Sequence, residues 1–204
     1  MAVLVIGFFG YIVFSKNSED TNQTVDTSGG SSHTKGEGAS GVTLVEYGDF
    51  QCPTCGSYYP IMKEISKKYK DQVVFQFRHF PLVQIHQNAM VAHRTAEAAG
   101  KQGKFWQMHD LLYERQQTWS ESTNAERIME DYATELALNI DTFKADFASS
   151  AVSDVITADL KLGQSQGVSA TPSFVLDGVK IEELPRNVES FSKLIDEAIA
   201  NKSN

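Results

Sequence analysis

The run "VTLVEYGDFQCPTCGSYY" constrains the fold most, because in it a buried strand passes directly into a helix. Residues 42–47 are mostly apolar or β-branched, at a length typical of a buried strand. Apolar residues then recur at helical spacing over 53–70, and "VVFQF" at 73–77 predicts a second strand. We therefore expect a βαβ unit with parallel strands. Its strand-to-helix junction carries both cysteines of the chain, Cys52 and Cys55.

Beyond this unit the pattern is helical and then returns to strands. A hairpin is predicted from "SFVL" at 173–176, the turn dipeptide "DG" and the run "VKI". An amphipathic helix over 187–201 closes the chain. The order βαβ, helical block, ββα predicts an α/β fold. Helices of the block are expected at 87–101, 105–115, 124–136, 142–148 and 152–164.

The first fourteen residues are uncharged and almost all apolar. This run is shorter than the about 20 residues of a membrane span and has the length of a signal h-region, so we expect its start to lie upstream of Met1. No small-x-small cleavage site follows it, which favours an uncleaved membrane anchor at 1–14 over a removed signal segment. The alternative is a buried strand or helix of the main domain.

Residues 15–41 are rich in Ser, Thr, Gly, Asn and acidic residues, which predicts a disordered polar linker. The main domain is predicted at 42–204, with a helical insertion at about 82–168. The formal net charge is -8, and phosphate binding needs a concentrated basic face, so we expect no nucleic-acid partner.

The cysteine pair allows three interpretations. A structural zinc site needs four ligands, and the five histidines show no H-x3-5-H spacing after the cysteines, so we expect no metal. A structural staple would close a loop too small to constrain the unfolded chain much. A redox site explains more of the sequence, because a helix N-terminus favours a thiolate at Cys52. Cys55, one turn on, would resolve a mixed disulfide, and Pro53 suits the first helical position.

Several motifs in order extend this interpretation: "VEYGDFQCPTC", "FRHFPL", "NAMVAHRTAEAAGKQGKFWQMHDLLYE", "GVSATPSFVLDG" and the closing helix. With them the chain resembles the DsbA-like thiol-disulfide oxidoreductases over nearly all of 42–202. The resemblance implies a thioredoxin-like fold, βαβ–ββα, with an inserted all-helical subdomain. It also implies a redox-active Cys52–Cys55 disulfide that needs no other cofactor.

The resemblance further implies a cis peptide bond at Thr171-Pro172, in a substrate-binding loop that faces the cysteines. An ordinary trans turn is the alternative, since only about 5–6% of X-Pro bonds in folded proteins are cis. Glu46 matches a buried acidic residue that relays protons to Cys55, with a pKa raised by burial. Strand alternation allows a solvated carboxylate there equally well. No basic residue in "KDQVVFQF" matches the cation that often accompanies this acid.

Pro53 and Thr54 lie between the cysteines and are expected to tune the redox poise. Strongly oxidising members of the family often carry His where this chain has Thr54. A threonine offers one hydrogen bond and no charge, so we predict a Cys52 pKa that is lowered less than in the strongest oxidants. Asp49 is expected to order the turn before the helix.

The leading functional hypothesis is a monomeric oxidase on the extracytoplasmic face of the cell membrane, held by its N-terminal segment. Reduced exported proteins are its expected substrates, and a membrane-embedded, quinone-linked partner is expected to reoxidise it. A secreted protein is the alternative location. The alternative functions are a reductase or isomerase with the same cysteines, or a non-catalytic peptide-binding domain.

Two further groups of residues are predicted to be structural. Apolar residues at helical spacing in the block could line a substrate groove, but such residues are more often core. Four histidines have no partner that the sequence makes visible. The apolar residues are Phe105, Trp106, Met108, Leu111 and Leu112, and the histidines are His79, His86, His93 and His109.

Overall fold

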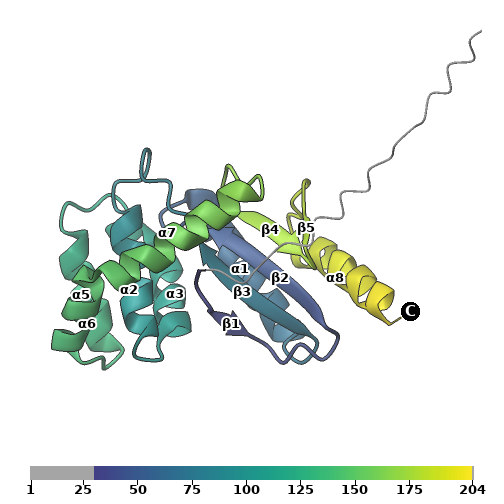
Figure 1. The fold of residues 1–204 in the computed structure, drawn as a ribbon, viewed down its shortest axis with the longest axis horizontal. Helices are drawn as coiled ribbons and strands as arrows, with labels where there is room; N and C mark the ends of the chain where they lie inside the picture. Colours follow the sequence, from purple (N-terminus) through teal and green to yellow (C-terminus); the bar gives the residue numbers. More distant parts are fainter. Residues whose placement is uncertain (1–29, 204) are drawn as a thin grey trace, which may run out of the picture.

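The computed structural model describes residues 30–203, which form a five-stranded sheet with helices on both faces and a helical block at one end (Figure 1). The strand order is β1-β3-β2-β4-β5. Strands β2 and β3 are parallel and the other neighbours are antiparallel, so the predicted α/β thioredoxin-like fold is confirmed. The strands are β1 (Thr34–Lys35), β2 (Val42–Gly48), β3 (Val73–His79), β4 (Ser173–Leu176) and β5 (Val179–Lys180).

Helices α1 and α8 cover one face of the sheet, and α7 crosses the other (Figure 1). Six helices lie between β3 and β4, where the sequence predicted a helical insertion. The short α4 was not predicted, because a single turn has no periodicity to detect. The helices are α1 (Pro53–Lys68), α2 (Ala89–Gly100), α3 (Phe105–Glu114), α4 (Gln116–Trp119), α5 (Ala125–Glu135), α6 (Ile140–Ala148), α7 (Ser150–Ser165) and α8 (Val188–Lys202).

Side-chain alternation along β2 divides the sheet between two cores. Leu44 packs with Ile65 of α1 and Phe191 of α8. Val45 points the other way, into the cluster that includes Leu160 of α7. Because alternate residues share a face, Glu46 lies on the α1 side of the sheet. This is the side on which α1 carries the second cysteine.

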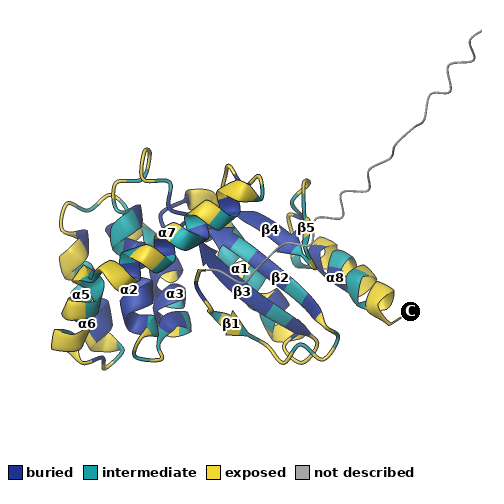
Figure 2. Cartoon of the chain, in the orientation of Figure 1, coloured by how far each residue is buried: buried dark blue, intermediate teal, exposed yellow. Residues whose placement is uncertain are grey.

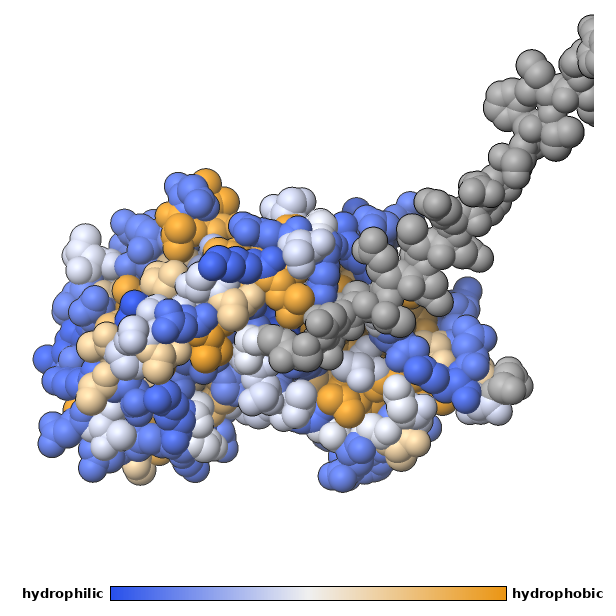
Figure 3. Space-filling model, in the orientation of Figure 1, coloured by the Kyte–Doolittle hydropathy of each residue, from blue (hydrophilic) through white to orange (hydrophobic). Residues whose placement is uncertain are grey.

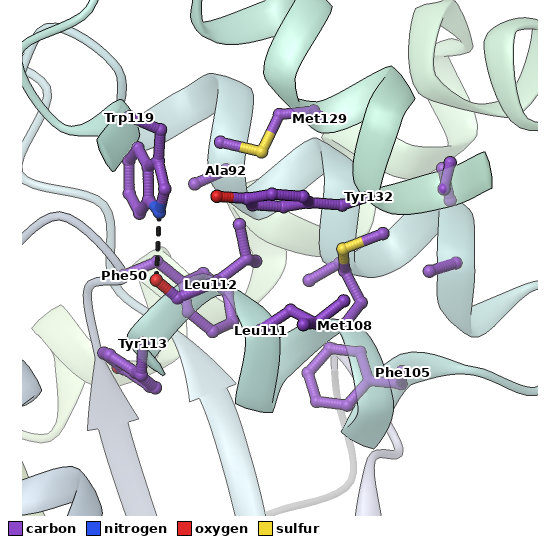
Figure 4. Packing of buried hydrophobic residues seen from close by; sticks show 14 of the residues in the cluster. Phe50, Ala92, Phe105, Met108, Leu111, Leu112, Tyr113, Trp119, Met129 and Tyr132 are labelled. Atoms are coloured by element: carbon purple, nitrogen blue, oxygen red, sulfur yellow. Dashed lines mark hydrogen bonds between the residues drawn. The ribbon is translucent and has the colours of Figure 1, made fainter. Parts of the chain in front are cut away.

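The helical block has its own apolar core (Figure 4). Figure 2 shows the buried faces of α2 and α3 turned toward this core. The indole N–H of Trp119 donates to the carbonyl of Leu112, which anchors α4 to α3. The prediction that the apolar residues of "FWQMHDLL" are core is confirmed for Phe105, Met108, Leu111 and Leu112, and Trp106 is partly buried.

The predicted linker at 15–41 is wrong for residues 30–41, which belong to the folded domain and are called the N-terminal arm below. Strand β1 of the arm pairs with β3, with Lys35 opposite Phe75. Ser31 is buried, and its backbone N–H and hydroxyl donate to Asp159 of α7 at 2.9 and 2.5 Å. The arm is held by polar contacts and not by apolar ones. Its polar composition therefore predicted a disordered linker although the segment is folded.

The predicted membrane anchor at 1–14 and the first part of the predicted linker lie outside the described residues. Within residues 30–203 no helix is both long enough and apolar enough to cross a membrane. In Figure 3 the surface over α5 and α6 is mainly hydrophilic.

Candidate active site

The two cysteines lie where β2 leads into α1. Cys52 is the N-cap residue of the helix, with extended backbone, and Pro53 occupies the first turn as predicted. The side chain of Cys52 is 7% exposed, whereas Cys55, one turn further on, is fully buried. The free backbone N–H groups of the first turn therefore face Cys52.

The loop before Cys52 is fixed by buried polar side chains. Asp49 accepts from the backbone N–H groups of Gln51 and Leu82, both at 2.9 Å, so it orders the turn as predicted. Burial alone would raise the pKa of Asp49, but the contacts with His93 and His86 and the Leu82 N–H outweigh it and hold the pKa at about 2. Asp49 therefore stays ionised, and able to accept these bonds, at neutral pH.

The loop is also joined to the helical block. The side-chain amide of Gln116 in α4 donates to the carbonyls of Phe50 and Cys52, at 2.7 and 2.9 Å. Sequence reasoning did not single out Gln116, since it lies 64 residues from Cys52 in the chain. The helical block therefore helps to position the loop that carries Cys52.

The Thr171–Pro172 loop faces the first cysteine, and its peptide bond is cis, as the resemblance implies. The Sγ atom of Cys52 lies 3.4 Å from the carbonyl oxygen of Thr171, 119 residues away in the chain. Pro172 has no backbone N–H to compete for hydrogen bonds. The loop thus leaves its peptide edge beside the sulfur, where an extended peptide can pair with it.

The surroundings of Cys52 lower its pKa to about 5. The largest cause is a hydrogen bond with the Cys55 thiol. Burial opposes the shift, and the Thr171 side chain and the backbone N–H groups of Cys55 and Thr54 add to it. The Thr171 hydroxyl has no other partner within the described part of the chain, so it is free to turn toward a thiolate. The Thr171 carbonyl, which accepts only from the protonated thiol, acts in the opposite direction.

Thr54 itself is exposed. Among residues 30–203 its hydroxyl makes no hydrogen bond, and its carbonyl accepts from Ser57 at 2.7 Å. It therefore contributes to the Cys52 thiolate through its backbone N–H alone.

Cys55 has the opposite environment. Burial raises its pKa well above the ordinary value, and the hydrogen bond and charge of Cys52 and the charge of Glu46 raise it further. A buried thiol of this kind stays protonated unless a nearby base removes the proton. The two sulfurs are therefore unequal, with one anionic at neutral pH and the other neutral.

Glu46 is partly buried, and its charge acts on Cys55. Burial raises its pKa to about 7, and the positive charge of Lys35 limits the rise. Lys35, from β1, is the cation that sequence reasoning missed, because its segment was assigned to the linker. Glu46 and Lys35 line a cavity of about 30 Å³, large enough for one or two waters.

Tyr113 of α3 is a second residue that sequence reasoning missed. It lines the same cavity, and its hydroxyl is buried without a hydrogen-bond partner in the described part of the chain. Burial raises its pKa well above the ordinary value, and the nearby charges of Cys55 and Glu46 add to this. A neutral hydroxyl at this place can donate to a water in the cavity that Glu46 also lines.

The histidines do have partners, contrary to what the sequence made visible. Most of these partners are far from the histidine in the sequence, and the adjacent Asp110 forms no recognisable motif with His109. His79 pairs with His93 and Glu97, both at 2.6 Å, His86 pairs with Asp49 at 2.7 Å, and His109 pairs with Asp110 at 3.0 Å. None of these contacts reaches a cysteine sulfur directly.

Two surface features adjoin the junction. A groove of about 930 Å³ is lined by Pro53, Gly56 and Gln116, among others. The loop between β3 and α2 exposes the side chains of Val83 (46%) and Ile85 (73%). The backbone N–H of Leu82 joins this loop to Asp49, three residues before Cys52.

A family model described as thioredoxin matches residues 28–197, and the chain belongs to this family. The Na(+)/H(+) antiporter NhaA 3 of Salinispora tropica is 36% identical over 169 residues, which cover 83% of this chain and 25% of the antiporter. NhaA 1 of Salinispora arenicola is 36% identical over 168 residues, covering 82% and 25%. The chain thus spans about a quarter of the length of these curated relatives.

Solved structures share the whole fold. A thioredoxin-like oxidoreductase from Silicibacter pomeroyi matches with a TM-score of 0.68 and 24% identity, covering 81% of this chain and 91% of that one. The α-DsbA1 of Wolbachia pipientis matches with a TM-score of 0.73 and 20% identity, covering 83% of this chain and 91% of that one. BdbD from Bacillus subtilis matches with a TM-score of 0.71 and 22% identity, covering 84% of this chain and 97% of that one. The resemblance to the DsbA-like thiol-disulfide oxidoreductases is thereby confirmed at the level of the fold.

Proposed function

We propose that the chain is a thiol-disulfide oxidoreductase that introduces disulfides into reduced exported proteins through Cys52 and Cys55. The observation that carries this proposal is the difference between the two sulfurs. The pKa of Cys52 is lowered to about 5, while that of Cys55 is raised. A stabilised Cys52 thiolate favours the reduced form of the pair, and a pair that prefers to be reduced is an oxidant.

In the reaction, a substrate thiolate attacks the Sγ atom of Cys52, and the Cys52–Cys55 bond breaks as the mixed disulfide forms. Cys55 leaves with the bonding electrons and takes a proton. The second substrate thiolate then attacks the substrate sulfur of the mixed disulfide. This forms the substrate disulfide and releases Cys52 as a thiolate. Two electrons pass from the substrate to the pair.

The proton for Cys55 comes from Glu46 in this scheme. A thiolate with a raised pKa is a poor leaving group, because buried charge is costly. Glu46, with its pKa at about 7, holds a proton in a good fraction of molecules at neutral pH. Water in the cavity beside Lys35 can reload it from the surface.

The substrate lies as an extended chain along the Thr171–Pro172 loop in our proposal. The exposed side chains of Val83 and Ile85 offer it an apolar contact, of the kind that an unfolded exported protein can make. Asp49 binds the loop that carries Val83 and Ile85, and Gln116 binds the carbonyl of Cys52, which supports a preformed site.

We further propose that the domain acts as a monomer outside the cell membrane, tethered by its N-terminal segment, and that a quinone-linked membrane partner reoxidises it. Relatives named as sodium–proton antiporters share a region similar to this domain, which supports a place beside a membrane. A milder oxidant than the strongest family members is expected, since about 5 lies between the Cys pKa values of about 7 in thioredoxin and about 3.5 in DsbA.

The test uses the disulfide form of the protein and a reduced test protein with two cysteines. One disulfide should form in the test protein for each Cys52–Cys55 pair that is reduced. The Cys52→Ser variant should form none. Reduced Cys55→Ser, mixed with a single-cysteine peptide that carries an activated disulfide, should accumulate a Cys52–peptide mixed disulfide and release the activating thiol, because the resolving thiol is missing. Oxidation by Cys52→Ser would show that Cys52 is not the sulfur that the substrate attacks, and no exchange by the wild type would favour a binding domain.

A further inference from the structure

Three side chains with metal-binding atoms meet beside the arm, away from the cysteines. They are His33 of the arm, His79 at the end of β3 and Glu97 of α2. One carboxylate oxygen of Glu97 lies 2.5 Å from Nε2 of His33 and 2.6 Å from Nε2 of His79. All three ligand atoms lie within 4.8 Å of one another. Two imidazoles and one carboxylate are a common donor set for zinc-class ions.

The contacts around His79 leave a place for a cation between these atoms when His93 carries its ring proton on Nε2. Nε2 of His93 faces an oxygen of Asp49 at 3.6 Å, so the ring proton of a neutral His93 is favoured there. Nδ1 of His93 then accepts, and Nδ1 of His79 donates across the 2.6 Å contact. Nε2 of His79 is left as a bare lone pair, 2.6 Å from the Glu97 oxygen. Two lone pairs at this distance repel unless a proton or a metal ion lies between them.

The third ligand is held in place by its neighbours. The ring of His33 stacks on Phe105 with centroids 3.5 Å apart and planes 5° from parallel. Gly100 makes room for it, since a Cβ atom there would lie 3.0 Å from Cε1 of His33. The side chain of His33 is 17% exposed, while those of His79 and Glu97 are 0% and 8% exposed. Solvent can therefore reach the cluster past His33, as an entering ion and a water ligand would require.

We propose that His33, His79 and Glu97 bind one divalent transition-metal ion of the zinc class, with water as a further ligand. Zinc–nitrogen and zinc–oxygen bonds of about 2.0–2.2 Å place ligand atoms roughly 3.3 Å apart in a tetrahedral site. The Glu97 oxygen needs to withdraw by less than roughly 1 Å to admit such an ion. His93 behind His79 supplies the outer hydrogen bond that orients a metal-bound imidazole, and Asp49 faces the other nitrogen of His93 at 3.6 Å.

Such an ion would fasten the N-terminal arm to the helical block. His33 lies two residues before Lys35, whose positive charge limits the pKa of Glu46. Metal binding at His33 would therefore help to keep the Lys35 ammonium group close to the Glu46 carboxylate. The metal site itself does not depend on the redox function proposed above.

Cobalt(II) is a suitable probe because its visible absorption reports coordination. The protein should be free of a histidine tag and in the disulfide form, which removes the thiols as competing ligands. We expect one Co²⁺ per chain with the absorption of a four- or five-coordinate site, displaced by Zn²⁺. The melting temperature should rise with metal concentration, because only the folded chain assembles the three ligands.

Two ligand variants and one control complete the test. His33→Ala and Glu97→Gln should each weaken Co²⁺ binding by more than about tenfold. His109→Asn, which alters a histidine paired with a carboxylate outside the cluster, should bind as the wild type does. Absence of saturable binding, or unchanged binding by His33→Ala, would overturn the proposal. A melting temperature that changes with pH but not with metal concentration would also overturn it, because a proton would then lie between the imidazole nitrogens and Glu97.

Discussion

Cys52 and Cys55 share one turn of helix, but their surroundings differ in nearly every respect. Cys52 has the N–H groups of the helix end around it and the Thr171 loop in front of it. Cys55 is fully buried in the apolar core that includes Phe50 and Phe77. The first environment stabilises a thiolate, and the second stabilises a thiol.

The spacing of two cysteines does not by itself define a redox catalyst. Two cysteines in equal surroundings would share their charge and have no preferred point of attack. Here the sheet supplies Glu46, whose charge acts on the fully buried sulfur, and a distant loop supplies Thr171 beside the other sulfur, which is 7% exposed. The fold thus separates the nucleophile from the resolving thiol.

The thiolate at Cys52 should make the stability of the reduced protein depend on pH. Its pKa is about 5 in the folded chain, against about 8.5 for a free thiol, so the thiolate contributes stability above pH 8.5 that is lost as pH falls through 5. At pH 7 the gain over a free thiol is roughly 2 to 3 kcal/mol. Urea unfolding of the reduced and disulfide forms at pH 7 and pH 4.5 measures it. A difference between the two forms that does not change with pH would contradict the assignment.

The Glu46→Gln substitution should slow exchange on the order of 30-fold, because Cys55 loses its proton donor while water in the cavity replaces it only in part. The step in the rate near pH 7 should disappear with it. Stopped-flow oxidation of a reduced peptide measures both. Glu114→Gln, at an exposed carboxylate paired with Lys63, is the matched control and should leave rate and profile unchanged. An identical slowing in the control would show that net charge, not the relay, is responsible.

Thr54→His should make the pair more oxidising by about 30 mV, equivalent to about 1.4 kcal/mol or a tenfold change in the equilibrium constant. Thr54 is exposed, so a protonated imidazole fits there and adds a positive charge near the Cys52 thiolate. The potential should be measured at pH 6 and pH 8. Thr54→Gln, which adds size without charge, should stay near the wild type. The charge interpretation fails if Gln and His give the same shift.

Lys35→Met should have the smallest effect. Lys35 lowers the pKa of Glu46, so its loss should raise the midpoint of the rate profile by about half a pH unit, close to a threefold change in rate on the alkaline side. The pH profile of peptide oxidation measures it. Lys70→Met, at an exposed lysine, serves as the control. A lower midpoint in Lys35→Met would reverse the assigned sign.

The part of the fold that carries the cysteines was predictable because its signals are local. The strand before Cys52, the helix after it and Pro53 at the helix start all lie within one short run of sequence. Family motifs added the place of Pro172 and the position of Glu46. These residues could be predicted from the chain without coordinates.

The arm and its contacts could not be predicted in the same way. The arm is held by Asp159, which lies 128 residues from Ser31 in the chain. Its strand has two residues, too few for alternation to be detected. For this reason Lys35 was missed as the partner of Glu46, and His33 as a neighbour of Glu97. Polar long-range contacts leave no periodic pattern in a sequence.

The reduction potential of the Cys52–Cys55 pair, measured against glutathione buffers, decides between an oxidase and a reductase. Stabilisation of the Cys52 thiolate predicts a value between about -200 and about -120 mV, in the range of oxidising family members. A value near the about -270 mV of thioredoxin would contradict the oxidase assignment and make the pair a reductase.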